Sequence, residues 1–154
     1  MSPRVTPLCC GSIAMDARVD LVGEPGRVEV PSTVFLIEAA ETIRVDNSFG
    51  DRERVTEAHP GFECYRAPDQ RLRHVLDAEG YTPADVDTVV FSHLDWDHCH
   101  NLDLFGDDTT FRVGARELAY ATDPYPPHTV RYEADPGSRT PAWRDRDLRP
   151  IEGE

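Results

Sequence analysis

The sequence contains no lysine, so all 16 of its basic residues are arginine, and 29 acidic residues outnumber them to give a formal net charge of −13. Nucleic-acid binding takes its affinity from a surplus of positive charge that neutralises phosphates. A chain with this deficit of positive charge is therefore not expected to bind nucleic acid.

Long apolar runs are also missing. None approaches the ~18 residues that cross a bilayer, and Pro3, Pro7 and Asp16 interrupt the N-terminal stretch before the apolar part of an export signal can form. The four cysteines, of which Cys9 and Cys10 are adjacent, lack the spacing of a disulfide scaffold. We expect no membrane span, no export signal, reduced thiols and a cytoplasmic location.

What remains is the composition of an ordinary soluble domain. The chain has 154 residues, of which 39% are apolar and 29% charged, and this length predicts one domain with one core. β-branched and aromatic residues fill segment 26–50, which predicts a hairpin with its turn at 39–41 and its second strand ending at Asp46. A strand end is a favoured place for a functional carboxylate.

Segment 52–67 is polar and contains Pro60 and Gly61, so it predicts a surface loop. An apolar stripe then predicts a helix within 68–81, followed by a capping motif at Thr82 and a buried strand at 86–91. Strand 109–113 and helix 114–122 continue this alternation, which is typical of an α/β layer. Repeated prolines make 123–154 a loop or tail, so we place the domain at 1–122.

The chemistry of the sequence is concentrated in FSHLDWDHCHN at 91–101, directly after the predicted buried strand. This run holds His93, Asp95, Asp97, His98 and His100. Imidazole and carboxylate groups together are ligands of first-row metals, of which zinc is the commonest in such a set. The arrangement predicts two metals, one held by His93 and Asp95 and its neighbour by Asp97 and His98. The alternative is a polar turn whose acids cap a helix and whose histidines face water.

This segment resembles the H-x-H-x-D-H signature of the metallo-β-lactamase superfamily, and its surroundings resemble the branch that hydrolyses N-acyl homoserine lactones. The strand pair ending at DNSFG, the helix and strand of GYTPADVDTVVFSH, and the strand and helix of FRVGARELAYA follow the family's order. The similarity covers most of residues 8–122. It implies an α/β fold, namely half or a truncated form of the family's αββα sandwich.

The resemblance also implies roles for individual residues. His93 would bind the first metal, and Asp97 and His98 the second. Asp97 would in addition orient the nucleophilic hydroxide or handle its proton, which makes it the catalytic residue. Asp46 would support residues 91–101, here called the metal loop, from behind, although a turn-capping role is an equal alternative for it. Zinc, one ion or two, is the implied cofactor, with iron or manganese as alternatives.

Two departures from the family pattern affect these expectations. Asp95 stands where the family has a histidine, which weakens the first metal site or favours iron or manganese. The family's later ligands, another histidine, a bridging aspartate and a final histidine, are not visible. His100 is an added potential donor, whereas His59 and His128 are predicted to be surface residues and Trp96 a core or wall residue.

The sequence thus predicts a metal-dependent hydrolase relative that acts on lactone or ester-type carbonyls through a metal-bound hydroxide. Because the ligand set is incomplete, we expect at most one tightly held metal, and poor or absent lactone hydrolysis by the isolated monomer. The alternatives are a noncatalytic, degenerate metal-binding half-domain that pairs with a second copy or a complementing chain, and a gene fragment without activity.

Overall fold

The computed structural model of the chain describes residues 2–19, 21–134 and 140–153. Short 3-10 helices connect several of the regular elements. In chain order, the strands and α-helices are β1 (Arg4–Asp16), β2 (Arg27–Glu38), β3 (Thr42–Val45), α1 (Arg52–Ala58), β4 (Glu63–Tyr65), α2 (Leu72–Ala78), β5 (Thr88–Phe91), β6 (Thr110–Gly114), α3 (Ala115–Thr122) and β7 (Leu148–Ile151).

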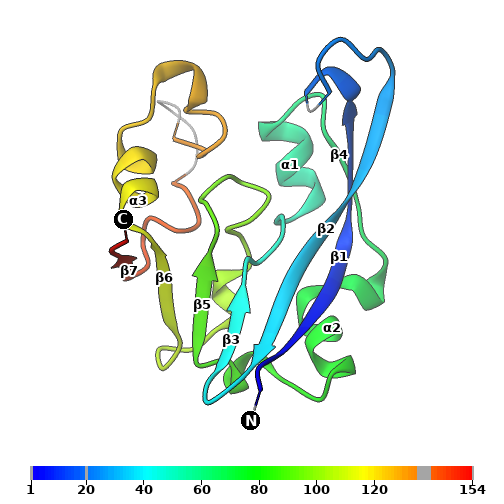
Figure 1. The fold of residues 1–154 in the computed structure, drawn as a ribbon. Helices are drawn as coiled ribbons and strands as arrows, with labels where there is room; N and C mark the ends of the chain where they lie inside the picture. The colour runs from blue at the N-terminus through cyan, green and yellow to red at the C-terminus, as the bar shows by residue number, and fades with distance from the viewer. Residues whose placement is uncertain (1, 20, 135–139, 154) are drawn as a thin grey trace.

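These strands form one seven-stranded sheet in the order β4-β1-β2-β3-β5-β6-β7 (Figure 1). Strand β1 pairs antiparallel with β2 and β4, and β2 pairs antiparallel with β3. From β3 onward the pairing is parallel, through β5 and β6 to β7. Because parallel neighbours end at the same edge of a sheet, the residues that follow β3 and β5 are brought together. The fold is mixed α/β, as the sequence predicts.

Local patterns account for the elements nearest this edge. In β2 the side chains of Ser32, Val34 and Leu36 are buried while Phe35 is exposed, which is the alternation of a strand with one covered face. The predicted hairpin is confirmed by the antiparallel β2–β3 pairing. The predicted helices and strands between 68 and 122 correspond to α2, β5, β6 and α3.

The expectation of an irregular loop over 52–67 is wrong, because this segment contains α1 and β4. The side chain of Asp51 caps α1 by accepting a hydrogen bond of 2.8 Å from the Glu53 amide. Val55 is the one buried residue in α1, so the helix has no apolar stripe in its sequence. Strand β4 is three residues long and gains its stability by pairing with β1.

Beyond Asp123, where a loop or tail is predicted, the described residues form irregular chain, a short 3-10 helix at Pro126–His128 and one strand. Strand β7 pairs with β6 at the edge of the sheet (Figure 1). Residues 135–139 of this segment lie outside the described residues. The residues that precede them, 131–134, pass close to the loop after β5, where the backbone amide of Trp96 donates to the carbonyl of Arg131 at 2.8 Å.

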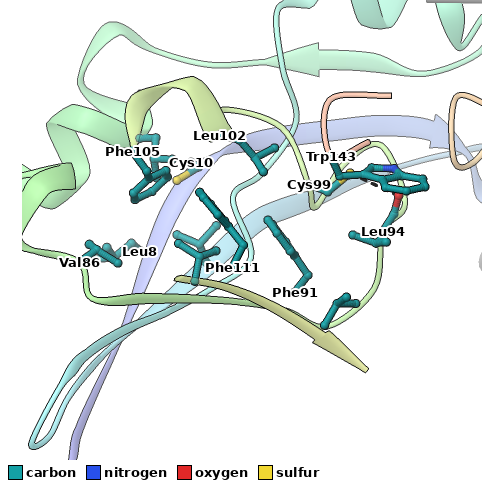
Figure 2. Packing of buried hydrophobic residues seen from close by; sticks show 14 of the residues in the cluster. Leu8, Cys10, Val86, Phe91, Leu94, Cys99, Leu102, Phe105, Phe111 and Trp143 are labelled. Carbon is teal, nitrogen blue, oxygen red and sulfur yellow. Dashed lines mark hydrogen bonds between the residues drawn. The ribbon is translucent and has the colours of Figure 1, made fainter. Parts of the chain in front are cut away.

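The main core joins the sheet to α2 and to the loops after β5 (Figure 2). Leu94, Cys99 and Trp143 gather at one end of it, so the loop that carries the histidines is anchored by apolar side chains between its polar ones. All four cysteines are free thiols. Within the described ranges, no helix has the length and apolar character needed to cross a membrane.

Candidate metal centre

Asp46 lies at the junction of β3 and β5 and holds the start and the end of the metal loop together. It accepts hydrogen bonds from the Ser92 amide at 2.8 Å, from the Ser92 hydroxyl at 2.7 Å and from His98 Nδ1 at 2.9 Å. The backbone of Asp46 is left-handed, with φ 62°, a conformation that aspartate tolerates better than most residues. This turn directs the carboxylate of Asp46 back under the loop.

The second nitrogen of His98 faces Asp97. His98 Nε2 lies 3.5 Å from Asp97 Oδ2, while Nδ1 is taken by Asp46. Burial alone would lower the pKa of His98, but the hydrogen bonds and negative charges of Asp46 and Asp97 raise it to about 10. A carboxylate behind the ring fixes its orientation and makes Nε2 a better metal ligand. Asp97 and His98 therefore present two donors to one position.

The other predicted pair, His93 and Asp95, has a different environment. His93 Nε2 lies 3.7 Å from Asp95 Oδ2, and the ring of His93 lies 4.0 Å from that of His98, centroid to centroid. Asp95 is buried, with 6% of the residue exposed, and Arg131 donates to Asp95 Oδ2 from Nε at 2.9 Å and also from Nη2. The hydrogen bond to Asp95 raises the pKa of Arg131. Asp95 is thus already paired with a cation.

A second cluster of charged side chains, centred on Glu133, lies next to the loop. His100 Nε2 lies 3.2 Å and His59 Nε2 3.4 Å from the carboxylate oxygens of Glu133, and Arg54 donates to both oxygens. Burial alone would raise the pKa of Glu133, but the hydrogen bonds from His100, His59 and Arg54 lower it below its usual range. We call residues 131–133, which supply both Arg131 and Glu133, the strap.

The prediction that His59 is a surface residue is wrong, because its side chain is 4% exposed and stacks on Trp96 with ring centroids 4.3 Å apart. Trp96 is buried, as predicted for a core or wall residue. His128 is half-buried and hydrogen-bonded to the Tyr120 hydroxyl. His100, predicted as an added donor, is bound to Glu133 instead.

Sequence reasoning missed Arg54, Arg131 and Glu133. Each is a single charged residue in a polar segment, and the contacts of Glu133 with Arg54 and His59 span 79 and 74 residues. The spacing of residues along the sequence does not predict contacts over such separations. The one usable signal is His59, a histidine without a ligand-like partner nearby in the sequence.

The two predicted metal positions differ in how well they fit a cation. Asp97 and His98 fit one, because a carboxylate and a supported imidazole face each other. The pair of His93 and Asp95 does not, because Arg131 engages the Asp95 oxygen nearest to His93. In the described part of the chain, no group of three or more His, Cys, Asp or Glu side chains is arranged to hold a metal ion. A cation would complete its coordination with water or groups from elsewhere.

Comparison with known proteins places the chain in a family. The model of the metallo-beta-lactamase superfamily matches residues 60–153, so the chain belongs to that superfamily. Among curated proteins, none matches the chain.

Three solved structures illustrate that resemblance. A quorum-quenching N-acyl homoserine lactone hydrolase superposes with a TM-score of 0.72 at 20% identity over 99% of this chain and 59% of its own. A B. thuringiensis AiiA variant with bound N-decanoyl-L-homoserine gives 0.74 at 20% identity, over 99% and 61%. AidC, a dizinc quorum-quenching lactonase with a bound product, gives 0.61 at 13% identity, over 80% and 46%. The chain therefore shares their fold and spans about 60% of the length of the first two.

Proposed function

We propose that the chain is a metal-dependent hydrolase relative of the lactonase type that binds one divalent cation at Asp97 and His98. One observation carries this proposal. Asp46 accepts a hydrogen bond from His98 Nδ1, while the other ring nitrogen, His98 Nε2, lies 3.5 Å from Asp97 Oδ2. Zinc is the proposed cation, with iron or manganese as alternatives, since imidazole and carboxylate ligands suit all three.

A bound cation of this kind polarises a carbonyl and lowers the pKa of water, which is the chemistry that ester and lactone hydrolysis requires. Burial alone would raise the pKa of Asp97, but the hydrogen bond and charge of His98 lower it. The ionised carboxylate of Asp97 accepts a hydrogen bond from the attacking water and orients it toward the substrate carbonyl. Asp46 keeps the His98 ring in place during this step.

The proposed substrates are small lactones or esters, with N-acyl homoserine lactones as the first class to test. Support comes from the structural neighbours, since the AiiA variant holds N-decanoyl-L-homoserine and AidC holds the product of an acyl-homoserine lactone. The chain spans about 60% of AiiA, so the activity of a whole protein of that length belongs to the proposal.

The test is the turnover of N-acyl homoserine lactones and p-nitrophenyl esters by the chain after loading with zinc, manganese or iron. We expect slow, metal-dependent hydrolysis that is lost in Asp97→Ala, with Glu152→Ala, an exposed acid near the C-terminus, as the matched control. Misplacing a reacting group by ~1 Å costs about a hundredfold in rate, so slow turnover is expected from two protein ligands. Turnover that is unaffected by metal removal and by Asp97→Ala would exclude the proposal.

One observation favours a second candidate, a noncatalytic metal-binding half-domain that pairs with another chain. One face of the sheet carries apolar residues that the described chain leaves partly uncovered. The register places them side by side: Val5, Phe35, Ile37, Ile43, Val45 and Val90. Val5 is 57% and Phe35 39% exposed. Contiguous apolar surface of this kind marks an interaction site.

Sedimentation and metal analysis separate the two candidates. The second candidate predicts metal binding without turnover, together with a self-associated chain that Phe35→Glu converts to monomers. Lys or Arg would serve equally well as the introduced charge. A wild-type chain that sediments as a monomer and hydrolyses lactones excludes the second candidate and leaves the first.

A further inference from the structure

Asp95 is the member of the predicted ligand set that already carries a positive partner. Two nitrogens of the Arg131 guanidinium donate to the same oxygen, Asp95 Oδ2, and that oxygen is the one that faces His93 at 3.7 Å. The other oxygen, Asp95 Oδ1, is buried and has no hydrogen-bond partner among the described residues. The position between His93 and Asp95 is therefore bordered by a guanidinium.

Several contacts of the strap hold Arg131 in this place. The carbonyl of Arg131 accepts a hydrogen bond of 2.8 Å from the Trp96 amide, inside the metal loop itself. Two residues further on, Glu133 is bound by Arg54, His59 and His100, so the strap is attached on both sides of Tyr132. Although the Arg131 side chain is 54% exposed, its guanidinium is positioned by the fold.

A divalent cation bound by His93 and Asp95 would lie beside this guanidinium. Two positive charges held at the same carboxylate oxygen repel each other strongly where water is partly excluded, and the arginine side chain stays protonated at neutral pH. The carboxylate of Asp95 also has one negative charge, which the guanidinium already neutralises. A second cation at this position would have to displace Arg131 from Asp95.

We propose that the Arg131 guanidinium takes the place of a metal ion at Asp95, so that the loop binds a single divalent cation, at Asp97 and His98. This inference rests on the proposed function for the Asp97 and His98 position. It adds that the guanidinium of Arg131 replaces the first of the two metals predicted from the sequence, the one assigned to His93 and Asp95.

The test counts bound metal and does not depend on turnover. Metal-free protein is titrated with Co²⁺ or Zn²⁺ in a calorimeter, and the metal that stays bound after gel filtration is measured by elemental analysis. The variants are Arg131→Met, which removes the charge, and Arg131→Gln, which removes the charge but keeps an N–H donor for Asp95. Arg131→Lys keeps the charge, and Arg116→Met removes one charge from an exposed position on α3.

We expect one equivalent in the wild type, Arg131→Lys and Arg116→Met, and a second, weaker equivalent in Arg131→Met and Arg131→Gln. Arg131→Gln supplies the result if Arg131→Met does not fold. Two equivalents in the wild type, or one in both uncharged Arg131 variants, overturn this inference alone. No bound metal in the wild type, or an equivalent that survives Asp97→Ala, overturns the proposed function as well.

Discussion

The two sides of the metal loop are held by opposite means. On the sheet side, the carboxylate of Asp46 follows a regular strand and supports His98 from behind. On the strap side, Arg131 and Glu133 come from irregular chain and bind Asp95 and His100. A carboxylate behind an imidazole prepares that imidazole for a cation, whereas a guanidinium on a carboxylate occupies that carboxylate. Under the proposed function, ligand-like residues in this one short loop serve two different purposes: Asp97 and His98 bind a cation, and Asp95 and His100 anchor the loop.

The largest expected loss of stability comes from a substitution in the strap, Glu133→Ala. Glu133→Ala leaves Arg54, His59 and His100 buried or half-buried without their acceptor, and removing one partner of such a buried charge pair costs about 3–5 kcal/mol. Urea denaturation with Glu152→Ala as the control measures the loss in the free energy of unfolding. If Glu133→Ala unfolds at the wild-type urea concentration, the strap does not anchor the loop.

On the sheet side, Asp46→Ala should lower both stability and metal affinity. It leaves the Ser92 amide and His98 Nδ1 without an acceptor, while the Ser92 hydroxyl keeps only His93 Nδ1 as a partner, at a cost of about 1–3 kcal/mol. Loss of a carboxylate behind a ligand histidine weakens metal binding about 10- to 100-fold. Calorimetric zinc titration checks this, and Asp46→Asn, which keeps an acceptor and tolerates φ 62°, should lose less stability than affinity. Wild-type zinc affinity in Asp46→Ala would contradict the supporting role.

Acid should weaken the strap in a way that depends on Glu133. Its pKa in the folded protein is below its ordinary value of 4.5, so the unfolded chain takes up this proton first as pH falls. The stability that Glu133 contributes is therefore present above pH 4.5 and is lost below it, by at most about 1.4 kcal/mol per pH unit. Urea midpoints measured from pH 6 to pH 3 should fall less steeply in Glu133→Gln than in the wild type. Parallel profiles would show that Glu133 makes no such contribution.

The smallest effect is expected where the two sides meet, at Trp96. Trp96 stacks on His59 and meets the edge of Phe62 with ring centroids 5.4 Å apart. Trp96→Phe keeps an aromatic ring but reduces the stacking area, so we expect a loss of about 1 kcal/mol. Thermal unfolding measures it, and the number of bound metal ions should not change. A changed metal count would mean that Trp96 positions the ligands directly.

The contrast between regular strands on the sheet side and irregular chain on the strap side also explains which elements the sequence predicts. The β2–β3 hairpin, α2, β5, β6 and α3 have local signals, such as alternating burial in β2 and the Thr82 and Asp85 capping motif, and they were predictable. Helix α1 and strand β4 were not, because one buries a single side chain and the other is three residues long. Strand β1 contains Pro7, which is unusual inside a strand, and a register shift between Cys9 and Ser12 that hides its alternation.

The residues of the candidate site also fall into two groups, those that the sequence predicts and those that it does not. The motif at 93–98 and the strand-end position of Asp46 are visible in the sequence because their residues follow predictable strands. Arg131 reaches Asp95 across 36 residues and Glu133 reaches His59 across 74, from a proline-bearing segment without a regular pattern. Contacts of that kind depend on where the chain returns in three dimensions, which neither charge nor spacing along the sequence determines.

The hydrogen bonds of Asp46 also have a consequence for the order of folding. They join it to Ser92 and His98 across 46 and 52 residues, and they require the parallel pairing of β3 with β5. Closing a loop of this length and forming parallel pairs are slow steps, because chain entropy is lost before contacts compensate for it. His98 therefore reaches its final orientation only after the centre of the sheet has assembled. Under the proposed function, a nascent or partly unfolded chain therefore has the HLDWDH residues but not the arrangement of Asp46, His98 and Asp97 that would bind a cation.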